Sequence, residues 1–191
     1  MRNKSIDITK GILIFFVVLG HIADGGSYIH KYVYWFHMPA FFIISGLFMR
    51  KDCCLKDEIK KRTYRLLVPY LFFSIFFGTI AREGNILKQL VGTIIGANGN
   101  ITSYTFPYYF LTVLFVASIF LYAINKRTTN ATWYLFLGYV VTHVATMFIS
   151  HDLLSWIPWN VDIAICMAFY MFLGNKHKNL ILQNGGVNGA L

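Results

Sequence analysis

Charged residues are scarce in this chain of 191 residues. They make up 13% of the sequence, whereas hydrophobic residues make up 57% and aromatic residues 18%. A soluble domain carries about 25% charged residues, so the polar side chains are too few to coat a soluble globule. The composition predicts an all-α, polytopic transmembrane helical bundle.

Acidic residues are scarcer still. Asp and Glu number 8 against 17 Lys and Arg, which gives a formal net charge of +9. Such an excess can indicate a nucleic-acid-binding protein. Here, however, the basic residues stand in short clusters between long apolar runs. Charges placed in this way are topology signals or contacts to anionic headgroups and ligands, so we expect no nucleic-acid partner.

Cysteine and the common cofactor motifs are also lacking. The three cysteines, Cys53, Cys54 and Cys166, cannot make a disulfide framework. The adjacent pair in a basic loop is expected to be reduced in the cytoplasm, or else palmitoylated. Metal-ligand clusters, a phosphate-binding loop and a serine-hydrolase elbow are missing from the sequence, and we expect no bound cofactor and no metal.

Long apolar runs dominate what is present. A bilayer core needs about 20 apolar residues in a helix, with a range of about 17–25. Six stretches come near that length, at about 8–23, 32–49, 65–81, 106–124, 132–149 and 159–174. Within the connection 82–105, apolar residues recur at helical spacing and predict a short amphipathic helix at the membrane interface.

The basic clusters alternate between the two sides of this threading. With the amino terminus in the cytoplasm, fourteen of the 17 Lys and Arg residues fall on the inside. This bias is the positive-inside pattern, and it places both termini in the cytoplasm. The protein is therefore expected to be a multi-pass protein of the cytoplasmic membrane, with residues 179–191 as a flexible polar tail.

Ionisable groups in the first helix are candidates for function, because they are costly within a membrane. Asp7 and Lys10 are three residues apart and can pair across one turn. Lys10 and His21 are eleven apart, which returns to the same helix face about 16 Å along the axis. Histidine is the side chain best suited to move a proton near neutral pH. An interfacial histidine that reaches the headgroups is the alternative for His21, and Asp24 could orient its ring.

The second helix carries another histidine beside a proline. His37 is either a functional imidazole or a hydrogen-bonded structural one. Pro39 removes a backbone donor and tends to kink the helix. Ser45-Gly46 allows close helix packing and brings a hydroxyl to membrane depth. His37, Ser45 and Asp7 are therefore candidate substrate or pocket residues.

Two arginines precede the third helix. Arg62 and Arg65 are three apart, which places them on one face of an α-helix. Arginine binds phosphate groups through two parallel hydrogen bonds. The alternative is a topology anchor on anionic lipid.

Several segments together resemble the membrane acyltransferase-3 family, and most closely its fucose 4-O-acetylase-like branch. The basic residue eleven positions before a histidine, Lys10 and His21, is similar to the opening signature of the family. The run Phe36-His37-Met38-Pro39 to Ser45-Gly46 resembles the second motif, and Arg62 to Pro69-Tyr70 resembles the third. Tyr109 to Phe115 and Pro158 to Asp162 continue the resemblance in order. It covers about residues 5–178, so one acyltransferase-3-like domain is expected over 1–178.

The resemblance implies an O-acyltransferase, most often an O-acetyltransferase. It would move an acyl group from cytoplasmic acetyl-CoA, a co-substrate, to a hydroxyl of a cell-surface glycan or lipid-linked sugar. His21 would be catalytic with Lys10 as its basic partner, and Arg62 and Arg65 would serve the acyl-CoA side. The expected action is O-acetylation, a form of polysaccharide modification.

The expected helix count differs from that of the family. Its members normally have about ten membrane helices, so the sequence is expected to be a truncated or split acyltransferase. In the split case, a second polypeptide would supply the missing helices. A small transporter or flippase of lipid-linked sugars and a non-catalytic remnant remain the alternatives.

Overall fold

The computed structural model describes residues 4–23, 27–49, 54–81, 86–95, 108–127, 130–149, 154 and 157–184. Over these residues the backbone is helical and no strand is formed. The helices gather into two compact units, of which the first comprises Met1–Met49 with Tyr170–Leu191 and the second Arg50–Phe169. The helical character predicted from composition is confirmed. Asp24, Cys53 and residues 185–191 of the predicted tail lie outside the described residues.

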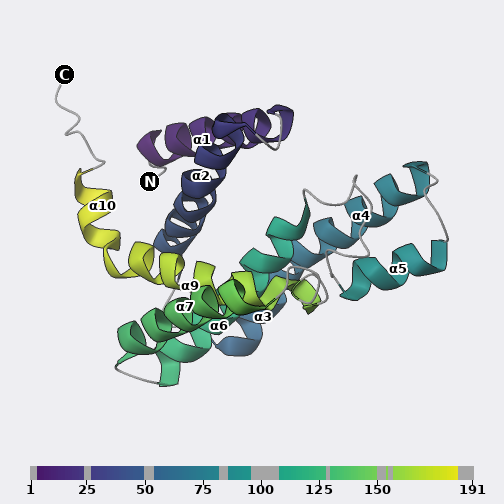
Figure 1. Ribbon diagram of the computed structural model, residues 1–191. Coiled ribbons are helices and arrows are strands. Elements are labelled where there is room, and N and C mark those ends of the chain that lie inside the picture. The colour runs from purple at the N-terminus through teal and green to yellow at the C-terminus, as the bar shows by residue number, and fades with distance from the viewer. Residues whose placement is uncertain are drawn as a thin grey trace. The chain divides into compact units, whose positions relative to one another are not determined.

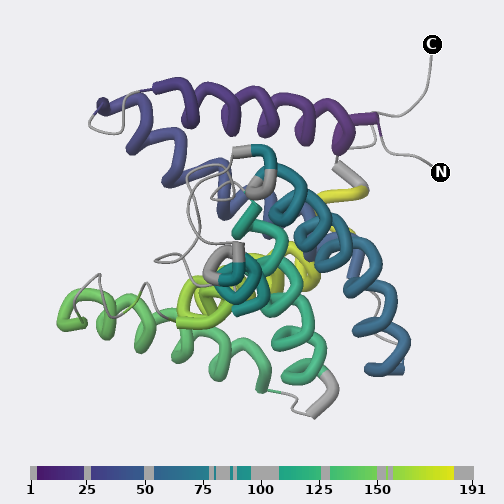
Figure 2. The backbone as a smooth tube through the Cα atoms, turned by 90° about the vertical axis from the view of Figure 1, so that its right-hand side faces the viewer, coloured from purple at the N-terminus to yellow at the C-terminus, as the bar shows by residue number. Residues whose placement is uncertain are grey.

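A helical hairpin forms most of the first unit. Helix α1 (Lys4–Ile22) and helix α2 (Tyr28–Leu47) pack along each other (Figures 1 and 2). Ser27 begins α2 by accepting a hydrogen bond from the His30 backbone N–H at 3.2 Å, which satisfies one of the donors that a helix start leaves open. Phe16 and Phe36 meet edge to face between the helices, with ring centroids 4.9 Å apart.

Helix α2 also approaches the end of α9 (Val161–Lys176) at the level of the backbone. A Cβ atom on Gly46 would clash with the Met171 carbonyl oxygen, and one on Gly174 would clash with the Ile43 carbonyl oxygen. Only glycine fits at such positions. The close packing predicted at Gly46 is therefore confirmed, and its partner is the backbone of Met171.

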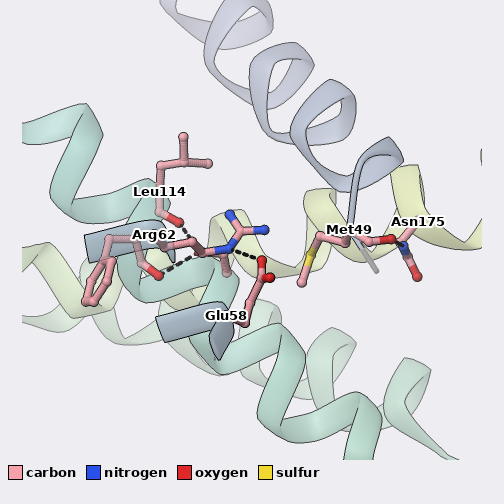
Figure 3. Close-up of polar contacts among 7 residues, drawn as sticks. Met49, Glu58, Arg62, Leu114 and Asn175 are labelled. Carbon is pink, nitrogen blue, oxygen red and sulfur yellow. Dashed lines mark hydrogen bonds and ion pairs between the residues drawn. The ribbon is translucent and has the colours of Figure 1, made fainter. Parts of the chain in front are cut away.

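A buried amide completes the carboxyl-terminal end of α2. Asn175 Nδ2 donates to the carbonyl oxygens of Gly46 at 3.2 Å and Met49 at 3.3 Å; Figure 3 shows the contact with Met49. Asn175 is only 7% exposed. The last carbonyls of a helix have no partner within the helix, so this side chain satisfies groups that would otherwise be buried without one.

The region predicted as a flexible tail begins with a further helix, α10 (Lys178–Asn184). Leu182 packs against an apolar cluster of the hairpin formed by Ile6, Leu13, Ile44 and Leu47. Leu180 and Ile181 are exposed, at 58% and 38%, so Leu182 is the residue of this segment that packs against the cluster. Residues of the predicted tail up to Asn184 are therefore helical, and the flexible polar tail over 179–191 stays a prediction.

The second unit contains a long helix built from three pieces, α3 (Leu55–Arg62), the π-helical turn η1 (Thr63–Leu67) and α4 (Val68–Ala81). The Val68 N–H donates to the Thr63 carbonyl, a π-type bond. Pro69 has no N–H for the Arg65 carbonyl, and its ring would crowd that carbonyl in a regular α-helix. The wider turn accommodates the proline, so the chain continues as a helix.

Helix α5 (Ile86–Ile95) matches the predicted amphipathic helix, and two side chains donate hydrogen bonds to carbonyls at its carboxyl-terminal end. The Tyr70 hydroxyl donates to the Thr93 carbonyl at 2.9 Å, and the Trp159 indole donates to the Ile94 carbonyl at 2.8 Å. Trp159 and Asn160 have φ angles of 55° and 50°, a left-handed conformation that is uncommon for such residues. The bond to Ile94 helps to hold this strained turn, η4 (Pro158–Asn160).

Helices α6 (Tyr109–Arg127) and α7 (Ala131–Phe148) complete the second unit together with the start of α9. Phe136 and Tyr139 of α7 contact the Phe169 ring, at centroid distances of 5.8 and 5.4 Å. Cys166 is buried with its Sγ atom 3.4 Å from His143 Nδ1. The cysteine thus occupies a packed position between α7 and α9.

Among the described helices, α1 and α7 are long and apolar enough to cross a membrane, and α6 has a shorter apolar stretch, Tyr109–Asn125. Large apolar side chains lie exposed on both longer helices, including Phe15 at 65% and Phe148 at 84%. The predicted count of about six membrane spans stays a prediction.

Candidate functional site

His21 lies beside the ring of Tyr34 at the carboxyl-terminal end of α1. The Tyr34 hydroxyl is 3.4 Å from His21 Nδ1, and the two rings meet edge to face. Gly20 makes this approach possible, because a Cβ atom there would lie 3.0 Å from Tyr34 Cε2 and 3.2 Å from Val33 Cγ1. The sequence pair Gly20-His21 thus places an exposed imidazole next to a partly buried phenol.

Two further histidines border the same tyrosine. The ring centroid of His30 lies 4.5 Å and that of His37 lies 4.9 Å from that of Tyr34. Residues 30, 34 and 37 follow i, i+4, i+7 spacing, which places them on one face of α2. The candidate site of the first unit, the imidazole–phenol cluster, is therefore His21, His30, Tyr34 and His37.

Backbone carbonyls fix the two histidines of α2. His30 Nδ1 lies 2.9 Å from the Gly20 carbonyl oxygen, and His37 Nδ1 is hydrogen-bonded to the Val33 carbonyl oxygen. A carbonyl only accepts hydrogen bonds, so Nδ1 carries the hydrogen in both rings. His37 is 2% exposed, so it is held rigidly whether its role is structural or chemical.

The other predicted residues of the first unit lie along the hairpin. The Lys10 ammonium sits over the Phe48 ring, 4.6 Å from its centroid, a cation–π contact. Asp7 lies in the first turn of α1 and is partly buried. Ser45 is partly buried beside Gly46. The structure brings His21 and His37 together around Tyr34, whereas Lys10 contacts the opposite end of α2.

Arg62 is held by a buried carboxylate in the second unit. Its Nε atom donates to Glu58 Oε1 at 2.6 Å across one turn (Figure 3). Glu58 is 5% exposed. A charge-assisted bond between such poorly solvated groups is short and strong.

Arg65 differs from Arg62 in its surroundings. The π-helical turn η1 begins at Thr63, between the two arginines, and Arg65 is exposed. The expectation of one shared face assumed α-helical spacing, which this turn alters. One guanidinium is therefore fixed by a carboxylate and the other faces outward.

Tyr34, His30 and Glu58 are the residues that the sequence reasoning did not single out. Tyr34 fitted the aromatic belt at the end of a span, and Glu58 lay in a charged segment that resembled a solvated loop. The i, i+4, i+7 spacing of the α2 residues is the signal that could have found the cluster. Within the described residues, no group of three or more His, Cys, Asp or Glu side chains is arranged to hold a metal.

The family model of the acyltransferase domain, of the acyltransferase-3 type, matches residues 3–176. The chain belongs to the acyltransferase-3 family. Members of this family are membrane proteins, in agreement with the apolar helices α1 and α7. The imidazole–phenol cluster and both arginines lie inside the matched region of this acyltransferase-3 domain.

Two curated relatives carry the name nodulation protein NolL. That of Mesorhizobium japonicum is 26% identical over 147 residues, which cover 69% of this chain and 38% of the relative. That of Sinorhizobium fredii is 32% identical over 119 residues, 48% of this chain and 32% of the relative. The acyltransferase-3 chain thus spans about a third of the length of these relatives. No solved structure matches it.

Proposed function

We propose that this chain belongs to a membrane O-acyltransferase, which acts on a hydroxyl of a glycan or lipid-linked sugar with acetyl-CoA as the donor. The family to which the chain belongs supports acyl transfer. We also propose that it belongs to the fucose 4-O-acetylase-like branch, which its sequence motifs resemble. The proposed place of action is the cytoplasmic membrane, with a multi-pass topology and the amino terminus inside.

The observation that carries the proposal is the contact of His21 with Tyr34. A hydroxyl group is a weak nucleophile until a base removes its proton, and histidine performs this task near neutral pH. In the proposed reaction His21 takes the proton of the sugar hydroxyl, whose oxygen forms the new bond to the acyl carbon. The bond between that carbon and the CoA sulfur breaks, and CoA leaves as the thiol after it takes up a proton.

The two arginines are proposed to serve the acyl donor, acetyl-CoA. CoA is polyanionic, and guanidinium groups suit phosphate. The exposed Arg65 is the group we assign to phosphate contact, while Arg62 is already engaged by Glu58. Lys10 is assigned a supporting basic role on α1.

The test measures transfer of labelled acetyl groups from acetyl-CoA in membranes that contain the protein. His21→Gln is expected to lower the rate by about a hundredfold or more, and Arg65→Ala to raise the KM for acetyl-CoA. Lys31→Gln, an exposed basic residue outside both clusters, is the matched control and should leave the rate unchanged.

Full activity of His21→Gln would contradict the assignment of the base. Movement of a lipid-linked sugar without modification would favour a transporter. Where the chain alone transfers nothing, co-expression with a polypeptide that supplies the rest of the family's helices tests the split form.

A further inference from the structure

The sequence resemblance points to His21 but leaves open what holds its ring. An imidazole that acts as a base through one nitrogen must keep its hydrogen on the other, and the hydrogen bond at that other nitrogen decides the tautomer. In His21 the nitrogen with a partner is Nδ1, and the partner is the Tyr34 hydroxyl at 3.4 Å.

We infer that Tyr34 is the positioning residue of His21: its hydroxyl oxygen accepts a hydrogen bond from His21 Nδ1–H and so leaves Nε2 as the basic nitrogen. This inference rests on the proposed function, because the role of His21 as the base selects the direction of the hydrogen bond. A hydroxyl can donate or accept. If Tyr34 donated to Nδ1, the hydrogen of the neutral ring would sit on Nε2, and that nitrogen could not take a proton.

The accepting direction also suits the whole reaction. Once Nε2 has taken the proton from the sugar hydroxyl, both ring nitrogens carry hydrogen. The bond from Nδ1–H to the Tyr34 oxygen is then the same bond as before. No rearrangement is needed between the resting base and the imidazolium, which is the condition for a preorganised site.

The surroundings of Tyr34 indicate that its ring is fixed. His30 and His37 contact the ring from two positions of α2; His30 is anchored by the Gly20 carbonyl and His37 by the Val33 carbonyl. On the side of α1, Gly20 lies against Tyr34 Cε2, where a side chain would be crowded. These contacts favour a Tyr34 ring that stays beside His21.

At 3.4 Å the contact between the Tyr34 hydroxyl and His21 Nδ1 is longer than the usual range for such groups. Tyr34 is assigned to orientation of the base, while contact with the sugar hydroxyl is left to His21.

The experiment reads the tautomer directly, without any need for activity. The full chain is reconstituted in lipid with ¹⁵N-labelled histidine, and solid-state NMR separates protonated from unprotonated ring nitrogens. The His21 signals are assigned by their loss in His21→Gln. We expect Nδ1 protonated and Nε2 unprotonated in the wild type, and a mixture of both tautomers in Tyr34→Phe, which keeps the ring but removes the hydroxyl.

Two further variants sharpen the comparison. Tyr32→Phe changes an exposed tyrosine of the same helix and should leave the His21 signals unchanged. Gly20→Ala tests the same hydrogen bond without a change to Tyr34 itself. The added methyl group would crowd Tyr34 Cε2 and shift the ring. This variant should also give a mixture of tautomers. Wild-type His21 protonated at Nε2, or identical His21 signals in Tyr34→Phe and wild type, would overturn the inference.

Kinetics then separate this inference from the proposed function. Tyr34→Phe is expected to lower kcat, by less than the loss in His21→Gln, with little change in the KM for acetyl-CoA, since the hydroxyl acts on the base and not on donor binding. Equal kcat values in Tyr34→Phe and wild type would contradict a positioning role. Full activity in His21→Gln would instead defeat the proposed base, and the NMR result would still decide whether Tyr34 sets the tautomer.

Discussion

At the scale of single residues, Glu58 shows that a charged segment can contain a buried carboxylate. The sequence placed it in a basic connection, where a carboxylate would be expected to face water. The fold turns it inward, 5% exposed, with the Arg62 guanidinium as its partner. Hydropathy cannot detect such a pair, because the two charges are four residues apart and either could be solvated.

Removal of this carboxylate should be costly. Glu58→Ala leaves the poorly solvated Arg62 without its partner, and the loss of one member of a buried pair costs about 3–5 kcal/mol. We expect a clear fall in the midpoint of thermal unfolding in mild detergent. Asp57→Ala changes the exposed neighbour in the same turn and should shift stability by about 0.5 kcal/mol or less. Equal midpoints for the two variants would show that the pair contributes nothing.

The candidate site was partly predictable at this scale. His21 and His37 stood out because an imidazole within an apolar run is costly. Tyr34 and His30 did not, because an aromatic residue at the end of a span has an ordinary explanation at the membrane interface. Their proximity follows from the packing of α1 on α2, which a single sequence does not specify.

At the scale of elements, apolar periodicity predicted most helices well. The stretches 8–23 and 132–149 correspond to α1 and α7, and the predicted interfacial helix corresponds to α5. Helix α3 was missed because six of its eight residues are charged. Its acidic first turn and basic last turn suit the helix dipole, a signal that hydropathy does not read.

The contact between α2 and α9 gives a prediction for a single methyl group. Gly46→Ala would set a Cβ atom against the Met171 carbonyl oxygen, and we expect a loss of about 2 kcal/mol or more, as for overpacked cores. Gly11→Ala is the matched control, since a Cβ atom there meets nothing within 4 Å, and the better helix propensity of alanine should keep it at least as stable as the wild type. The readout is thermal unfolding of each variant in the same detergent; a Gly46→Ala protein as stable as Gly11→Ala would refute the close approach.

At the scale of the whole molecule, the division into two units was not predictable. The sequence favoured a single domain over 1–178, and nothing in its composition marks the boundaries near Met49 and Tyr170. The first unit is discontinuous in sequence, and a pairing between distant segments leaves no local pattern. The orientation in the membrane stays a prediction, which rests on the distribution of Lys and Arg along the chain.

That orientation can be tested with two exposed lysines. In a variant without the native cysteines, Lys56→Cys should be inaccessible to a membrane-impermeant thiol reagent in intact cells, whereas Lys31→Cys should react. Both positions are exposed in the structure, so differences in labelling report the side of the membrane. Reaction of Lys56→Cys from outside would reverse the proposed topology.

The side-chain amide of Asn175 bears on the order in which the protein folds during synthesis. It donates hydrogen bonds to the carbonyls of Gly46 and Met49, which precede it by 129 and 126 residues. At about 5–20 residues per second of synthesis, the end of α2 waits on the order of ten seconds for this partner. The continuous second unit, Arg50–Phe169, can therefore form first, whereas the first unit must wait for its carboxyl-terminal segment, which starts at Tyr170.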